Sequence, residues 1–306
     1  MADIKNLLKN YLDYLEIEKN RSPKTRENYE RYLKAFFEFS GIKSEKEINV
    51  DKVKEFRLRL ARMKNEKGEY LKKSTQAYYV IALRNFLKYL IKNDYEVLSP
   101  DKIELPKIPA RQIKTIEYKD MERLLDAPHP PAGGNDLRVL RDKAILETLF
   151  STGLRISELC SLNRYIDINR GEITVRGKGG KLRVVFLSDR AKKALKNYLD
   201  KREDAEETLF VSLTKSKKPK VIGRILPRTA QRLVDFYSRK AGIFEKISPH
   251  QFRHQFATDL LIGGADLRSV QELLGHSNIS TTQIYTHLTN KELREVHKTF
   301  HARRRK

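Results

Sequence analysis

The sequence predicts a mainly α-helical protein of two domains, and three observations support this fold class. The chain has 306 residues, which is enough for two domains of ordinary size. A stretch with three prolines, SPDKIELPKIPARQ, interrupts the chain and shows no hydrophobic periodicity. Apolar residues recur at helical spacing on both sides of this stretch. We therefore expect a helical domain over residues 1–99, a linker over residues 100–114, and a mostly helical domain over residues 115–306.

Four helices are expected in the first domain. The segment LLKNYLDYL repeats leucine and tyrosine at helical spacing. The segment RSPKTRENYERYLKAFFEFSG has Ser22 as an N-cap, Pro23 at the first helical position and Gly41 at its end. VDKVKEFRLRLARM and STQAYYVIALRNFLKYLIKN supply two further helices, and the apolar stripes predict a four-helix bundle. Lysine and arginine crowd the polar faces, which fits either a solvated surface or a DNA-binding one.

The second domain begins with two helices, EYKDMERLLDA and DLRVLRDKAILETLFSTG. The periodicity then changes, and YIDI, GEITVRG and KLRVVFLS read as three short strands joined by glycine-rich turns. These strands predict a small three-stranded antiparallel sheet. After it the sequence returns to helical periodicity up to its end.

The composition indicates a nucleic-acid partner. Lysine and arginine number 63 against 40 acidic residues, which gives a formal net charge of +23. Such a chain binds polyanions, because each neutralised phosphate releases counterions. It shows no long uncharged apolar run, signal peptide or lipidation motif, so DNA or RNA is favoured over a membrane surface. The single cysteine, Cys160, excludes an internal disulfide and a cysteine-rich zinc module, and it fits a reducing, cytoplasmic setting.

The first candidate functional motif is TGLRISELCSL. Gly153 ends one helix and Arg155 opens the next, with Glu158 one turn later on the same face. This spacing is common for a surface ion pair. It also suits an anion site, because backbone N–H groups at a helix N-terminus already favour negative charge.

A glycine turn, RGKGGKLR, carries Lys178, Lys181 and Arg183 between two predicted strands. It is not a Walker A loop, because Leu182 stands where serine or threonine should follow the lysine. The turn is either a hairpin with solubilising lysines or a finger that reaches a phosphate or a DNA groove.

The segment SPHQFRHQFATDLL places His250, Arg253 and His254 at the start of a helix. The two histidines have metal-binding spacing, but the glutamate of the zincin motif and a third ligand are missing. A phosphate site is therefore the better interpretation. The segment LLGHSNISTTQIYTHL adds His276 in a turn and Tyr285 within a helix, where a core tyrosine is the alternative.

Together these motifs resemble one family. GLRxSEL, GKGxK, HxxRH, LLGH and IYTH, in this order and at these separations, are similar to the tyrosine recombinases of the phage integrase family. The Xer-type members are the nearest fit, and the resemblance covers essentially the whole chain. One departure is Phe252, where leucine is common. The resemblance implies an N-terminal SAM-like core-binding domain, a linker and a catalytic domain.

The resemblance also implies a reaction. Tyr285 would attack a DNA phosphodiester and form a 3′-phosphotyrosine. His250 would accept the tyrosine proton, and Lys178 would protonate the leaving 5′-oxygen. Arg155 and Arg253 would hold the non-bridging oxygens.

Two further residues have supporting roles by the same resemblance. His276 would hydrogen-bond the phosphate, and Glu158 would orient the arginines. Lys181 and Arg183 are expected to bind DNA. The reaction requires no metal ion, cofactor or ATP.

The expected partner is double-stranded DNA with an inverted-repeat recombination site, bound by a homotetramer or by a heterotetramer with a paralogue. A C-terminal helix over residues 290–303 presents Leu293, Val296 and Phe300 on one stripe. In the family a comparable helix docks into the neighbouring protomer, and packing on its own domain is the alternative.

The favoured function is Xer-like resolution of chromosome dimers, because the chain is compact and shows no additional arm-binding domain. The alternatives are an integrase of a mobile element, a type IB topoisomerase-like nicking-closing enzyme, and a non-catalytic DNA-binding protein on the same fold.

Overall fold

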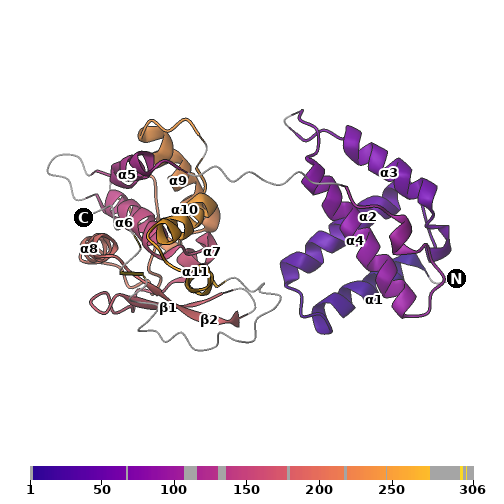
Figure 1. Cartoon of the computed structure of the whole chain (residues 1–306), viewed down its shortest axis with the longest axis horizontal. Coiled ribbons are helices and arrows are strands. Elements are labelled where there is room, and N and C mark those ends of the chain that lie inside the picture. The colour runs from indigo at the N-terminus through magenta and orange to yellow at the C-terminus, as the bar shows by residue number, and fades with distance from the viewer. Residues whose placement is uncertain are drawn as a thin grey trace. The chain divides into compact units, whose positions relative to one another are not determined.

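A computed structural model describes residues 3–66, 68–106, 116–129, 136–177, 180–216, 219–245, 247–275, 297–298 and 301. The chain divides into two compact units, Met1–Gln112 and Ile113–Lys306 (Figure 1). Each unit has its own hydrophobic core. Both units are mainly helical, which confirms the predicted fold class.

The first unit is a bundle of the four expected helices, namely α1 (Ile4–Ile17), α2 (Pro23–Ser40), α3 (Val50–Arg62) and α4 (Lys73–Lys92) (Figure 1). The predicted capping of α2 is confirmed: the Ser22 side chain accepts a hydrogen bond from the backbone N–H of Thr25, and Gly41 ends the helix at φ 61°. A short 3₁₀ turn, Pro100–Lys102, follows α4, and Ile103 is buried in the core of the bundle. The packing of this unit therefore continues past residue 99.

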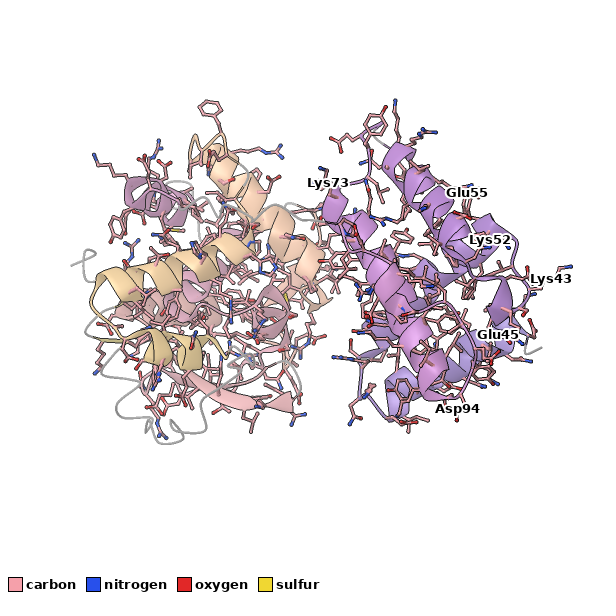
Figure 2. All side chains as sticks on the ribbon, turned by 45° about the vertical axis from the view of Figure 1, so that its right-hand side comes forward. Lys43, Glu45, Lys52, Glu55, Lys73 and Asp94 are labelled. Atoms are coloured by element: carbon pink, nitrogen blue, oxygen red, sulfur yellow. The ribbon has the colours of Figure 1, made fainter. Side chains whose placement is uncertain are left out.

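Aromatic side chains fill much of the core of this bundle. Tyr11 packs edge-on against Phe86 with ring centroids 5.3 Å apart, and Phe36 packs similarly against Phe56 at 5.2 Å. On the outer side of α3, the charged side chain of Glu55 points away from this core (Figure 2). The helices are thus amphipathic, as the spacing of their apolar residues predicts.

The second unit is organised around α6 (Leu137–Thr152), in which every residue from Ala144 to Thr152 is buried. The described part of this unit holds six further helices, namely α5 (Tyr118–Asp126), α7 (Ile156–Ser161), α8 (Asp189–Leu199), α9 (Pro227–Lys240), α10 (Pro249–Ile262) and α11 (Leu267–Leu274). Helices α8 and α10 pack directly on α6. The C-terminal end of α6, where α7 begins, therefore lies inside the unit.

The sheet differs from the prediction of three strands. Strand β1 (Glu172–Arg176) pairs antiparallel with β2 (Leu182–Phe186), with Thr174 opposite Val184, and no third strand joins this pair among the described residues. The segment YIDI is not a strand. Its backbone forms local turn contacts instead: the Ile166 N–H donates to the Arg164 carbonyl, and the Gly171 N–H donates to the Asp167 carbonyl.

A second two-stranded sheet was not predicted. It consists of β3 (Val211–Leu213) and β4 (Val221–Arg224), which pair antiparallel. Strands of three and four residues are too short for a period of two to stand out in the sequence.

A small apolar cluster joins β2 to the last helices. Its members are buried side chains of β2, α10, α11 and the turn between the two helices, namely Phe186, Phe256, Leu260, Ala265, Val270, Leu273 and Leu274. This cluster holds the β1–β2 hairpin against α10 and α11 (Figure 1). The hairpin, the start of α7 and the end of α11 consequently meet in one region.

Candidate active site

The motif GLRxSEL forms a sharp junction between α6 and α7. Gly153 ends α6 at φ 60°, and a Cβ atom at this position would lie 2.5 Å from the Phe256 ring. The chain then turns so that Glu158 accepts two hydrogen bonds from Arg155. One comes from the backbone N–H to Oε2 at 2.8 Å, and the other comes from Nη1 to Oε1 at 2.8 Å. The predicted pair is therefore a bidentate contact at the beginning of a helix.

Glu158 also binds Arg183 from β2. Arg183 donates from Nη1 to Oε1 at 3.0 Å and from Nη2 to Oε2 at 2.8 Å, so two arginines share one carboxylate. Burial raises the pKa of Glu158, but the hydrogen bonds from Arg183 and from the Arg155 backbone outweigh it and hold that pKa at about 2. Glu158 is therefore ionised at neutral pH.

Arg253 is a buried cation on the first turns of α10. Its guanidinium donates from Nη1 to the Gly153 carbonyl at 2.9 Å and from Nη2 to the Leu274 carbonyl. Its side chain contacts no carboxylate among the described residues, and the residue is 7% exposed. Burial, together with the charges of Arg155 and Arg183, lowers the pKa of Arg253 to about 10. The side chain still carries its proton at neutral pH.

The C-terminal end of α11 contacts three arginines. The carbonyls of Leu273, Leu274 and Gly275 accept hydrogen bonds in turn from Arg183 Nε at 3.0 Å, from Arg253 Nη2, and from Arg155 Nη2 at 3.4 Å. These carbonyls lack partners within the helix and form the negative end of its dipole, so cations are favoured there. Three consecutive carbonyls therefore hold the three guanidinium groups in one place.

The charges of this cluster do not cancel. Arg155, Arg183 and Arg253 carry three positive charges, whereas Glu158 carries one negative charge. The side chain of Arg155 is 27% exposed, so solvent reaches this cluster. A partly buried site with excess positive charge and rigid N–H donors is suited to an anion such as a phosphodiester.

The other predicted site residues are only partly described. His250 is exposed on the first turn of α10, one turn before Arg253, and Lys181 is exposed on the β1–β2 hairpin. Lys178, His276 and Tyr285 lie outside the described residues, so their roles stay predictions. In the described part of the chain no group of three or more histidine, cysteine, aspartate or glutamate side chains has the arrangement of a metal site.

Arg183 does not take the direction that the sequence suggests. We expected it to project from the hairpin towards DNA, but its side chain is 9% exposed and turns inward to Glu158 and the Leu273 carbonyl. Two glycines make room for it. A Cβ atom on Gly275 would lie 2.8 Å from Arg183 Cδ, and one on Gly177 would lie 3.2 Å from Nη1. The two glycines are visible in the sequence and indicate that another group could approach the backbone closely there. The sequence does not identify the side chain that does so.

None of the helices in the described ranges combines the length and apolar character needed to cross a membrane.

Comparison with known proteins gives matches along the whole chain. The model of the "Phage integrase family" matches residues 114–292, and that of the "Phage integrase, N-terminal SAM-like domain" matches residues 8–94. The tyrosine recombinase XerC of Escherichia coli is 37% identical over 311 residues, which cover 99% of this chain and 98% of that protein.

Two solved structures share the fold. A XerH site-specific recombinase bound to palindromic difH substrate, in a post-cleavage complex, has a TM-score of 0.64 and 23% identity, and the match covers 94% of this chain and 82% of that one. A lambda integrase tetramer bound to a Holliday junction has a TM-score of 0.67 and 17% identity, covering 93% and 80%.

Proposed function

Because the chain belongs to the phage integrase family of tyrosine recombinases, we propose that it cuts and rejoins DNA at specific sites through a covalent 3′-phosphotyrosine intermediate. The observation that carries this proposal is the cluster of three arginines around Glu158. Buried Arg253 contacts only backbone carbonyls among the described residues, and it lies beside Arg155, whose side chain is partly exposed. This cluster offers a phosphodiester two positive charges in excess.

The arginines would act on the transition state. Attack at phosphorus spreads negative charge over the non-bridging oxygens, and fixed guanidinium groups stabilise that charge more than they stabilise the starting diester. Arg155 and Arg253 are assigned this task. Their carbonyl and carboxylate contacts hold them in position before DNA arrives, which reduces the reorganisation that the reaction needs.

Bond formation and proton transfer are assigned to three residues by family membership. The phenolic oxygen of Tyr285 forms a bond to phosphorus while the bond from phosphorus to the 5′-oxygen breaks. His250 accepts the phenolic proton, because a phenol with a pKa near 10 is a poor nucleophile at neutral pH. Lys178 gives a proton to the departing 5′-oxygen. Religation is the reverse reaction, so no energy source is required.

We assign the chain to Xer-type recombination of the host chromosome. The support is the 37% identity with XerC over essentially the full length of both proteins. In this role four protomers bind two inverted-repeat sites in the cytoplasm, as a homotetramer or with a paralogue. A lambda integrase of similar fold forms a tetramer on a Holliday junction. A mobile-element integrase would instead act at an attachment site, so a single inverted-repeat site per chromosome favours the Xer role.

The test is a nicked suicide substrate, on which a covalent protein–DNA adduct accumulates because the short cleaved strand diffuses away. Wild-type protein is expected to form the adduct. The Tyr285→Phe variant should bind the half-site with near-normal affinity and form none, because only the hydroxyl is removed. Cleavage by Tyr285→Phe would contradict the assignment of the nucleophile, and the absence of a wild-type adduct would contradict the proposed function.

A second assay separates recombination from nicking and closing. A plasmid with two sites should be resolved into two circles by the wild-type protein. Relaxation of supercoiled DNA without resolution would instead indicate a topoisomerase-like enzyme. Arg239→Ala is a suitable charge control in both assays, because that side chain is 75% exposed and pairs only with Asp235 on its own helix among the described residues.

A further inference from the structure

Resting on the proposed function, we infer that Arg183 is a positioning residue that holds both phosphate-binding arginines in place and does not itself contact DNA. It lies on β2 opposite Val175 of β1, at the point where the hairpin meets α7 and α11. Its three nitrogen atoms all donate hydrogen bonds within the protein, two nitrogens to Glu158 and one to the Leu273 carbonyl.

Through Glu158, Arg183 controls Arg155. Oε1 of Glu158 accepts hydrogen bonds from both arginines, and Oε2 accepts from Arg183 and from the backbone N–H of Arg155. The fork of Arg183 therefore fixes the plane of the carboxylate. Without it the carboxylate can rotate about its side-chain torsions, and the direction of Arg155 becomes less defined.

Through α11, Arg183 controls Arg253. Its Nε atom holds the Leu273 carbonyl, and the next carbonyl along the chain, that of Leu274, binds Arg253. A shift of the last turn of α11 would move both contacts together. Arg183 thus contacts both Glu158, which binds Arg155, and the last turn of α11, which binds Arg253.

Arg183 also contributes to the net charge of the cluster at which a phosphate would bind. Glu158 is shared between Arg155 and Arg183, so Arg183 neutralises part of a carboxylate that would otherwise be paired with Arg155 alone. Removing Arg183 would reduce the net charge of the cluster from +2 to +1. The affinity of the site for the transition state should fall accordingly.

The burial of Arg183 separates this role from DNA binding. Its side chain is 9% exposed, whereas Lys181, two residues earlier on the same hairpin, is exposed. The Arg183 side chain lies close to Gly177 at its Nη1 atom and close to Gly275 at its Cδ atom, where larger residues would meet it. Lys181 and Arg183 are therefore a matched pair for an experiment, because they lie on one hairpin and carry the same charge.

The experiment compares Arg183→Gln with Lys181→Gln in the full-length protein. Half-site affinity is measured over a range of salt concentrations, and single-turnover cleavage is measured at saturating suicide substrate. We expect Arg183→Gln to leave the slope of log affinity against log salt unchanged and to slow cleavage by about 100-fold. Lys181→Gln should reduce the magnitude of the slope by about one. A slope reduced by about one in Arg183→Gln, with cleavage unchanged, would overturn the inference.

A double-mutant cycle with Glu158→Gln distinguishes positioning from general loss of structure. If Arg183 acts through Glu158, the double variant should cleave about as slowly as the slower single variant. Losses that multiply would overturn the inference. Should Arg183→Gln fail to fold, Arg183→Lys keeps the charge and the stem but lacks the fork. It is expected to bind DNA normally and to cleave about 10-fold slower, and full cleavage activity would overturn the inference.

The experiments on Arg183 and the test of the proposed function can fail independently of each other. Adduct formation by the wild-type protein tests the proposed function. The salt slope of half-site binding requires no cleavage, so it tests the DNA-contact alternative for Arg183 even if no adduct forms.

Discussion

At the scale of single residues, the site depends on how buried charges are compensated. Glu158 is ionised and accepts hydrogen bonds from two arginines, whereas Arg253 is ionised and donates only to backbone carbonyl oxygens among the described residues. An ion buried without an opposite charge is costly, and carbonyl dipoles offset that cost only in part. A bound phosphate would complete the compensation.

The low pKa of Glu158 predicts a dependence of stability on pH. Its folded-state pKa is about 2, well below the ordinary value for a glutamate, so its stabilising contribution is present above the unfolded value and is lost as pH falls from about 5 to 2. The full contribution corresponds to about 3 kcal/mol of unfolding free energy. We expect Glu158→Gln to remove this part of the acid sensitivity. Calorimetric unfolding of both proteins between pH 3 and 7 measures it, and equal pH dependence would contradict the assignment.

The role of Lys178 gives a second prediction at this scale. If Lys178 protonates the leaving 5′-oxygen, Lys178→Ala should cleave slowly on normal DNA. A substrate with sulfur in place of that bridging oxygen should restore its rate, because a thiolate leaves without a proton.

The control for this prediction is Arg253→Ala, which the sulfur substrate should not rescue, since Arg253 is assigned to the non-bridging oxygens. Equal slowness of Lys178→Ala on both substrates would exclude it as the general acid. Lys181, on the same hairpin, would then be tested in the same way.

At the scale of helices and strands, local signals predicted most of the fold. The helices of the first unit were predicted because capping and termination are encoded within a few residues, as at Ser22 and Gly41. The segment YIDI was wrongly predicted as a strand because alternation alone does not reveal whether a partner strand is present. The motifs of the site were found through their order and spacing.

The contacts between the arginines of the site and backbone carbonyls could not be predicted in the same way. Arg253 binds the Gly153 carbonyl, and Arg183 binds the Leu273 carbonyl, across long separations in sequence. Backbone carbonyls carry no residue-specific signal, so no pattern in the sequence points to these contacts. The inward direction of Arg183 was missed for the same reason.

At the scale of one helix, the described residues of the C-terminal segment pack on their own unit. His297 Nε2 lies 2.7 Å from the Ser151 carbonyl oxygen of α6, and His301 Nδ1 lies 3.4 Å from Asp259 Oδ2 of α10. Burial, and the neighbouring His301, lower the pKa of His297 to about 3, so it is neutral at pH 7. These two positions therefore pack within the protomer.

The stripe of Leu293, Val296 and Phe300 lies outside the described residues and remains the predicted contact with a neighbouring protomer. Changing all three to serine should weaken assembly on paired sites by at least about 10-fold, because an apolar contact of this size contributes several kcal/mol. Half-site binding should change little. Gel shifts with one and two half-sites measure both, and unchanged cooperativity would indicate that this stripe, like His297, packs within its own protomer.

At the scale of the whole molecule, the formal net charge of +23 predicts steep salt dependence. Each phosphate contact contributes about 0.9 to the slope of log affinity against log salt, so several contacts give a slope of several units. Half-site binding measured from low to moderate salt tests this. A flat plot would remove DNA binding as the reason for the charge.

The anchoring of α11 also limits how far from it the predicted nucleophile, Tyr285, can lie. The Gly275 carbonyl accepts a hydrogen bond from Arg155, and Tyr285 lies ten residues further along the chain. A chain of that length spans at most about 35 Å when fully extended. The arginine cluster and the predicted nucleophile are thus connected by a short stretch of the same chain. If Tyr285 acted on a phosphate held by a neighbouring protomer, the arginine cluster of that protomer would have to lie within about the same distance.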